Sequence, residues 1–179
     1  MDDKQTMDME QHLLRDRFID FERGILQDNV LLCDTKAGLL LAFTGAMVIF
    51  CIDLVAKLGE TGSGASWAVA MTIRALLGLA GAGFLVSAHF SLTTVLPRMI
   101  RGRPDHLFWE SPVYYLPADE FVAEMQNLDP KVEQDDKLRH VHLLAGICRG
   151  KFQHFQIAMR YARLSFLCLV AGEVLRIVI

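Results

Sequence analysis

Basic side chains gather in two parts of the chain that also carry aromatic residues. A small anionic ligand is held in proteins by guanidinium groups and by stacking on aromatic rings. Attraction to anionic lipid headgroups, at about 1 kcal/mol per basic residue, accounts for the same group. The sequence does not separate a ligand site from a lipid contact. The residues concerned are Arg98, Arg101, Arg103, Arg149, Lys151, Arg160 and Arg163.

Four more charges lie near the ends of apolar segments: Asp53, Arg74, Glu173 and Arg176. Charges near lipid are costly unless they are paired, and we expect these four to lie at a similar depth. Two pairs are then available, Asp53 with Arg74, and Glu173 with Arg176 or Arg74. Ordinary anchoring of helix ends explains the four residues. A polar ring that lines a water-filled pathway in an oligomer is the alternative.

Other chemistry finds little support in the sequence. His140 and His142 are two residues apart and would point to different faces of a helix, and His154 has no second ligand nearby. Phosphate-binding loops, GxSxG and HExxH are absent. We therefore expect no enzyme, metal or cofactor, and the net charge of −3 gives no sign of a nucleic-acid partner. The cysteines show no CxxC spacing and are interpreted as small apolar residues: Cys33, Cys51, Cys148 and Cys168.

Apolar helices are the elements that must position these residues. Residues 37–56 carry one charge, Asp53, and residues 75–96 carry one ionisable group, His89. Twenty helical residues reach about 30 Å, the thickness of the hydrocarbon core of a bilayer. A short Gly/Ser loop joins the two stretches. The sequence predicts an all-α integral membrane protein with a transmembrane hairpin at residues 37–96, and small residues such as Gly83 and Ser87 predict close helix packing.

Basic residues predict the orientation of this hairpin. The loop between the stretches holds one lysine, whereas several arginines precede the first stretch and follow the second. Positive charge favours the cytoplasmic side, so we expect the loop outside and the N-terminus in the cytoplasm. The start of the chain is polar and acidic, which is unlike a cleaved signal peptide.

Three further segments complete the expected organisation. Residues 1–36 hold a cytoplasmic amphipathic helix, in which Gly24 allows a break. Residues 97–130 form a cytoplasmic connector, with a short helix after Pro117. Residues 131–179 form one long helix that ends in a third span from Leu164. Apolar residues at alternating spacings of three and four give this helix a seam, made by Leu138, Val141, Ala145, Cys148, Phe152, Phe155, Met159, Ala162, Phe166 and Leu169.

The layout of these segments resembles the transmembrane effectors of Pycsar anti-phage systems (PycTM-type). The similarity runs from Phe21 to the C-terminus. It rests on an Asp-x-Lys-Ala step at residues 34–37, a Lys-aromatic step at Lys151-Phe152, and their order around three apolar blocks. The segments that carry it are DNVLLCDTKAGLLLAFTGAMVIF, the second apolar stretch ending at Pro97, HLFWESP, and HVHLLAGICRGKFQHFQIAMRYARLSFLCLVAGEVL.

The resemblance implies a multi-pass protein of the bacterial inner membrane that is idle until a partner cyclase senses phage. The cyclase makes a cyclic pyrimidine nucleotide, cUMP or cCMP, and the effector then impairs the membrane, so that the infected cell stops growing or dies. Some related effectors carry a separate nucleotide-binding domain, for which we expect no room here. The positions that match the family motif are Asp34, Lys36 and Lys151. The candidates for nucleotide binding are Arg101, Arg103, Arg149 and Lys151.

Three helices from one chain enclose no aqueous path, so we expect a homo-oligomer assembled along the seam, with the ligand at or beside a subunit contact. A small structural or accessory subunit of another membrane complex would show the same spans and seam. That alternative stays open from the sequence. A membrane enzyme ranks behind both, because no catalytic site is recognisable.

Overall fold

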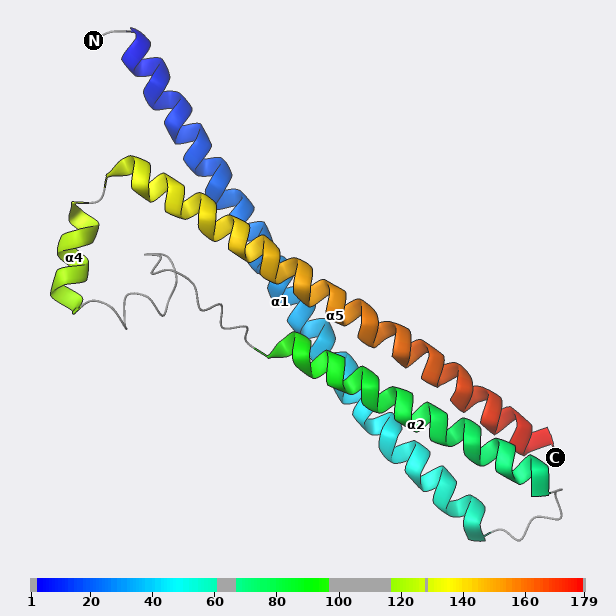
Figure 1. Cartoon of the computed structure of the whole chain (residues 1–179). Helices are drawn as coiled ribbons and strands as arrows, with labels where there is room; N and C mark the ends of the chain where they lie inside the picture. The colour runs from blue at the N-terminus through cyan, green and yellow to red at the C-terminus, as the bar shows by residue number, and fades with distance from the viewer. Residues whose placement is uncertain (1–2, 61–66, 97–116, 128, 179) are drawn as a thin grey trace. The chain divides into compact units, whose positions relative to one another are not determined.

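The computed structural model describes residues 3–60, 67–96, 117–127 and 129–178, and nearly all of these residues are helical. The helices there are α1 (Asp3–Glu60), α2 (Trp67–Val95), α4 (Ala118–Gln126) and α5 (Pro130–Val178), and these residues contain no strand (Figure 1). The expected all-α class is confirmed for the described residues.

Helix α1 is longer than the segments that the sequence separates, whereas α5 agrees with the single long helix expected. Helix α1 continues through Gly24 and past residue 36 without a break, so the amphipathic part and the first apolar stretch are one element. A glycine costs a helix interior only about 1 kcal/mol, which the neighbouring hydrogen bonds offset. Helix α5 runs unbroken from Pro130 to Val178, as the absence of proline after residue 130 predicts.

The residues divide into two compact units. The first unit comprises Met1–Leu31 and Pro97–Arg149, and the second comprises Leu32–Leu96 and Gly150–Ile179. Helices α1 and α5 contribute to both units, whereas α2 belongs to the second.

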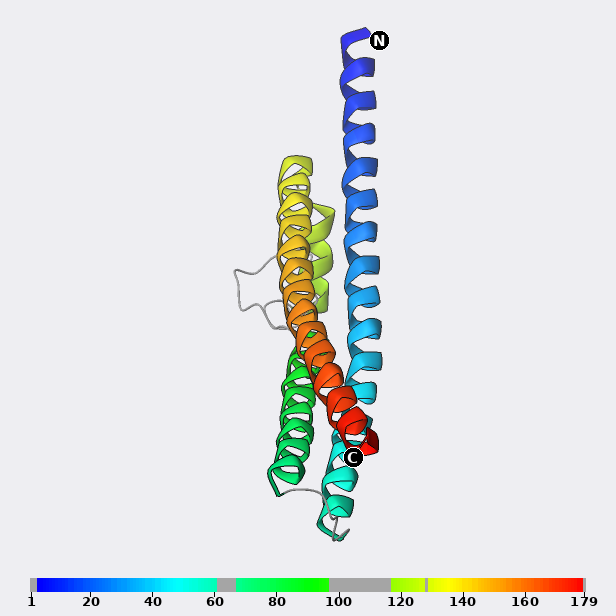
Figure 2. The ribbon, with the colours of Figure 1, turned by 90° about the vertical axis from the view of Figure 1, so that its right-hand side faces the viewer.

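The second unit is a three-helix bundle of α1, α2 and α5 segments that run alongside one another (Figures 1 and 2). The buried residues of α2 recur in alternating steps of four and three residues, which is the spacing of coiled-coil-like packing. They are Ile73, Leu77, Ala80, Phe84, Ser87, Ser91 and Thr94. The other two helices add a core cluster with Cys51 and Leu54 from α1 and Leu169 from α5.

Small residues set how closely the α2 and α5 helices approach. A Cβ added at Gly83 of α2 would collide with Ser165 Oγ of α5, and one added at Gly172 of α5 would lie 3.3 Å from a Leu77 methyl carbon. Close approach of backbones replaces the hydrophobic effect as the source of helix association in lipid. The close packing that the sequence predicts at Gly83 is therefore confirmed.

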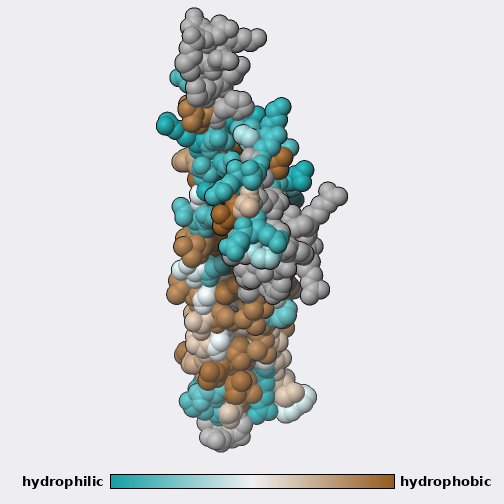
Figure 3. All heavy atoms as spheres, turned by 90° about the vertical axis from the view of Figure 1, so that its left-hand side faces the viewer, coloured by the Kyte–Doolittle hydropathy of each residue, from teal (hydrophilic) through white to brown (hydrophobic). Residues whose placement is uncertain are grey.

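Helices α1 and α2 are long and apolar enough to cross a membrane. Only 17% and 22% of their most apolar windows are buried, so most of this apolar surface faces outward, unlike the core helix of a soluble protein. On the face drawn in Figure 3, hydrophobic residues gather over the bundle, with hydrophilic residues near its end. The described residues thus contain two candidate membrane spans, and the third span stays a prediction.

The expected seam of α5 is only partly right. Cys148, Ala162 and Leu169 are buried, but Leu138, Ala145 and Phe166 are exposed. Within the bundle, the buried face of α5 carries mainly small and polar residues, because these allow the close contacts just described. That face is formed by Lys151, Ala158, Ala162, Ser165, Leu169 and Gly172.

The first unit packs the charged part of α1 against the beginning of α5. Ile19 is buried there, and the Gln134 side-chain amide donates a hydrogen bond to Asp16 Oδ1 at 3.4 Å. Asp129 caps α5, since its Oδ1 accepts a hydrogen bond from the backbone N–H of Lys131 at 2.9 Å. The short helix expected after Pro117 is α4, while residues 97–116 of the expected connector lie outside the described residues.

Candidate functional site

An ion pair between α1 and α5 lies inside the three-helix bundle. Lys151 Nζ donates to Asp34 Oδ1 at 2.5 Å, and 117 residues separate the two along the chain. The Lys151 side chain is only 6% exposed and the Asp34 side chain 29% exposed. Of the ion pairs in the described chain, it alone joins two different helices. The Asp34–Lys151 pair is therefore an ionic link between α1 and α5.

Neighbouring residues explain how the pair comes to be buried. Asp34 follows Cys33 and precedes Ala37 by one turn, and both of these small residues are at most 1% exposed. Lys151 lies seven residues before the fully buried Ala158 and so shares its face of α5. An ammonium removed from water costs several kcal/mol unless a carboxylate compensates it. Lys151 thus depends on Asp34 to be buried.

The contact between α2 and α5 is also polar. Ser87 Oγ of α2 donates a hydrogen bond to the backbone carbonyl of Ala158 of α5 at 2.8 Å. The buried Thr94 hydroxyl is satisfied within α2, where it donates to the Phe90 carbonyl at 2.9 Å. Ser91 Oγ and His154 Nδ1 are buried as well, and neither has a hydrogen-bond partner among the described residues. Unpaired buried polar atoms are uncommon and costly, by about 1–3 kcal/mol each. The described residues of α2 and α5 thus leave two buried polar atoms unpaired.

Aromatic rings of α2 and α5 also meet at this contact. The Phe90 ring lies 5.8 Å from the His154 ring and is stacked on Tyr161, with 6.3 Å between centroids and 6° between planes. His154 is one turn from Lys151 on α5, and Phe90 precedes Ser91 on α2. We call the six residues Asp34, Lys151, Ser87, Ser91, Phe90 and His154 the polar cluster.

Sequence reasoning identified part of this cluster and missed the rest. Asp34 and Lys151 were matched to the family motif and are brought together, whereas Lys36 is exposed. Ser91 was missed, although Ser87, Ser91 and Thr94 continue the steps of four and three that begin at Ile73. That spacing was the available signal.

The nucleotide-binding candidates have different environments. Arg149 is exposed on α5, so its guanidinium is accessible to a ligand. Lys151 is buried and bound to Asp34, so it can reach a ligand only if that pair opens. Arg101 and Arg103 lie outside the described residues.

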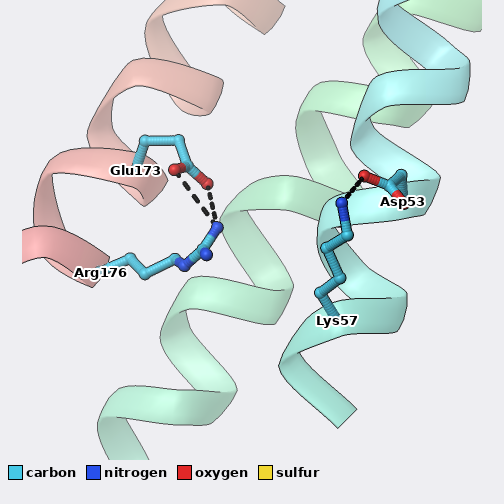
Figure 4. Close-up of polar contacts among 4 residues, drawn as sticks. All are labelled: Asp53, Lys57, Glu173 and Arg176. Atoms are coloured by element: carbon cyan, nitrogen blue, oxygen red, sulfur yellow. Dashed lines mark hydrogen bonds and ion pairs between the residues drawn. The ribbon is translucent and has the colours of Figure 1, made fainter. Parts of the chain in front are cut away.

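The expected pair of Asp53 with Arg74 is wrong. Asp53 Oδ2 instead accepts from Lys57 Nζ, one turn further along α1, at 2.6 Å (Figure 4). Arg74 donates a hydrogen bond to the Leu58 carbonyl at 3.2 Å. Helix α1 extends to Glu60, which places Lys57 on the same helix face as Asp53.

The expected pair of Glu173 with Arg176 is present at 3.3 Å within α5. Figure 4 shows it separate from the Asp53–Lys57 pair. Each pair is a local contact within its own helix, α1 or α5, and the four side chains are 28–62% exposed. Such exposed pairs contribute little to stability.

Other potential ligands form no centre in the described chain. No group of three His, Cys, Asp or Glu residues there is placed to hold a metal ion. All four cysteines are free thiols, and three of them, Cys33, Cys51 and Cys148, are buried.

Comparison with known proteins assigns the chain to a family. The family model for the Pycsar effector protein domain (PycTM) matches residues 20–177, which includes α2, α4, most of α1 and nearly all of α5. No curated protein and no solved structure is significantly similar to the chain. The family supports a role in Pycsar anti-phage defence, which implies a partner cyclase in general terms. Since the match spans nearly the whole chain and the polar cluster within it, the chain belongs to the Pycsar effector family.

Proposed function

We propose that this chain is the membrane effector of a Pycsar system, and that a cyclic pyrimidine mononucleotide, cUMP or cCMP, switches it from an idle to a damaging state. The damage is a loss of inner-membrane integrity that arrests or kills the infected cell. The observation that carries the proposal is the family match over a bundle whose apolar helices are mostly exposed. A soluble enzyme would bury such helices in its own core.

In this proposal α5 supplies a third span. Its last part packs beside α2 through Gly172 and Leu77, so it follows the candidate spans along their length. Its outward residues are apolar and exposed, as lipid contact requires. These residues are Leu164, Leu167, Val170, Val174, Ile177 and Val178. With the loop between α1 and α2 outside, the N-terminus and α4 lie in the cytoplasm.

The polar cluster serves as the switch. The Asp34–Lys151 pair holds α1 to α5, while Ser91 Oγ and His154 Nδ1 have no hydrogen-bond partner among the described residues. Opening the bundle lets water satisfy both atoms, which lowers the cost of the open state. A ligand shifts such an equilibrium only by binding one state more tightly than the other.

The ligand contact in this proposal includes exposed Arg149, together with Arg101 and Arg103. A cyclic mononucleotide has one phosphodiester charge, which a guanidinium binds through paired hydrogen bonds. It also has a flat base, which stacks on aromatic rings. Arg149 lies two residues before Lys151 on α5, so a ligand bound at Arg149 acts on the same helix as the switch.

Damage requires several copies, because three helices from one chain enclose no aqueous path. In this proposal the charges Asp53, Arg74 and Arg176 face a water-filled gap between copies, which their exposure permits. An accessory subunit of another membrane complex remains the second candidate, and it predicts no toxicity with any nucleotide.

Cells that express the chain with its partner cyclase test this proposal. Growth arrest with loss of membrane potential is expected when the cyclase is active, and normal growth when the cyclase is inactivated by mutation. The triple variant Arg101→Gln, Arg103→Gln, Arg149→Gln should insert normally but lose the response. Arrest that is independent of cyclase activity would contradict nucleotide control. Normal growth with an active cyclase and an inserted protein would favour the accessory subunit.

A further inference from the structure

The charged part of α1 carries a row of large apolar side chains that no part of the described chain covers. Leu14, Phe18, Phe21 and Ile25 are 59%, 62%, 64% and 39% exposed. They follow one another in steps of four, three and four, and so lie on one face of the helix. We call these four residues the Leu14 stripe. Ile19, which packs inside the first unit, lies on a different face.

The bilayer does not account for this stripe. Residues 10–23 hold seven charged residues, which is incompatible with the hydrocarbon core. Single exposed apolar side chains are ordinary, but four aligned ones on a charged helix mark a contact surface. The steps of four and three are those of positions a and d of a coiled coil, with Phe18 and Ile25 at a and Leu14 and Phe21 at d.

The charges beside the stripe specify its partner. In a parallel two-stranded coiled coil, each g residue faces the e residue of the next heptad on the other chain. Counting from Phe18, Glu10 and Arg17 occupy g, and Arg15 and Glu22 occupy e. Two copies in parallel register therefore place Glu10 against Arg15 of the other copy, and Arg17 against Glu22. Both contacts join opposite charges.

A parallel arrangement follows from membrane insertion, because copies inserted with the same orientation present their α1 helices side by side in one direction. The charges concerned are available for such contacts. Glu10, Arg15 and Arg17 are exposed and Glu22 is partly so, and no ion pair within the described chain engages any of them.

We propose that the Leu14 stripe is the dimer contact of the protein, where α1 of a second copy packs in parallel register as a short two-stranded coiled coil. The contact is isologous, so each copy supplies both its apolar and its charged residues. It spans little more than two heptads, which makes the pairing reversible and dependent on confinement in the membrane. The inference rests on insertion in one orientation and not on a nucleotide response, so it can fail while the proposed function holds.

Disulfide formation between copies tests the pairing in the full-length protein. In a background with all four native cysteines replaced by alanine, Leu14→Cys places a thiol at d, next to its counterpart. Leu13→Cys is the matched control, since Leu13 is 56% exposed, is adjacent in sequence and falls at c, which points away from the partner. In membranes treated with a mild oxidant, Leu14→Cys should form dimers at least tenfold faster than Leu13→Cys.

Charge reversal tests the register. Added to Leu14→Cys, Arg17→Glu should lower dimer formation roughly fivefold, because both symmetric contacts become repulsive. Adding Glu22→Arg as well should restore it. Equal rates for Leu13→Cys and Leu14→Cys, or no effect of Arg17→Glu, would overturn the proposal. The proposal would also be overturned if Leu14→Cys stayed monomeric and its thiol did not react with a maleimide. That result would mean that the Leu14 stripe is covered by a contact within the chain.

Discussion

Removing the charge of Asp34 should destabilise the bundle far more than removing any exposed carboxylate. In Asp34→Asn, the ammonium of Lys151 remains, and its side chain is only 6% exposed. Breaking a buried pair from one side costs about 3–5 kcal/mol. The Asp34 side chain is 29% exposed, so water reaches this end and the lower value applies, about 3 kcal/mol. The unfolding equilibrium should shift by about 150-fold.

The two partners should behave asymmetrically. Lys151→Met leaves a carboxylate at Asp34 that can turn toward water, so its cost should be smaller, about 1–2 kcal/mol. The double variant Asp34→Asn, Lys151→Met contains no buried charge and should lie within about 1 kcal/mol of the original protein. A large coupling energy between the two positions is thus expected.

Equilibrium unfolding in mixed micelles titrated with SDS, followed by helical circular dichroism, measures these differences. Asp53→Asn is the matched control, because its pair with Lys57 is half exposed and should contribute no more than about 0.5 kcal/mol. If Asp34→Asn costs no more than Asp53→Asn, the pair does not hold the bundle. If the single effects simply add in the double variant, the two charges do not depend on each other.

Two other predictions concern packing and topology. Gly83→Ala should destabilise the bundle by about 1–3 kcal/mol, because its Cβ meets Ser165 Oγ, and Ser165→Ala should relieve much of this cost in SDS unfolding. Gly78→Ala, with no atom within 4 Å of the added Cβ, is the control and should be tolerated. In intact cells, a cysteine introduced at Ser63 should react with an impermeant thiol reagent, and one introduced at Asp129 should not. Labelling at Asp129 would contradict the proposed orientation.

Local properties of the sequence predict most of the fold. Short windows of sequence show the apolar stretches of α1 and α2 and the lack of proline along α5 after Pro130. The structure has a helix in each of these three segments. The continuity of α1 through Gly24 is harder to predict from the sequence, because one glycine weakens a helix by too little to end it. Because α1 continues past residue 56, Lys57 lies next to Asp53 and pairs with it. The prediction that Asp53 pairs with Arg74 was therefore wrong.

Contacts between distant segments are harder to predict. Asp34 and Lys151 were singled out by resemblance, but nothing in either segment states that they touch. The seam of α5 was placed on large apolar residues such as Phe166, which is exposed. In lipid both large and small apolar residues are stable on the outside, and the buried face is chosen by how closely backbones approach. Periodicity alone therefore identifies the helix but not its inner face.

Purified protein in liposomes tests the central claim most directly. The liposomes hold a potassium diffusion potential that is reported by a voltage-sensitive dye, and insertion is verified by protease protection. Addition of cUMP or cCMP should collapse the potential in liposomes with the protein and leave empty liposomes unaffected, while linear 5′-UMP and 5′-CMP should have no effect. A potential that persists with both cyclic nucleotides in liposomes with inserted protein would contradict a nucleotide-triggered membrane effector.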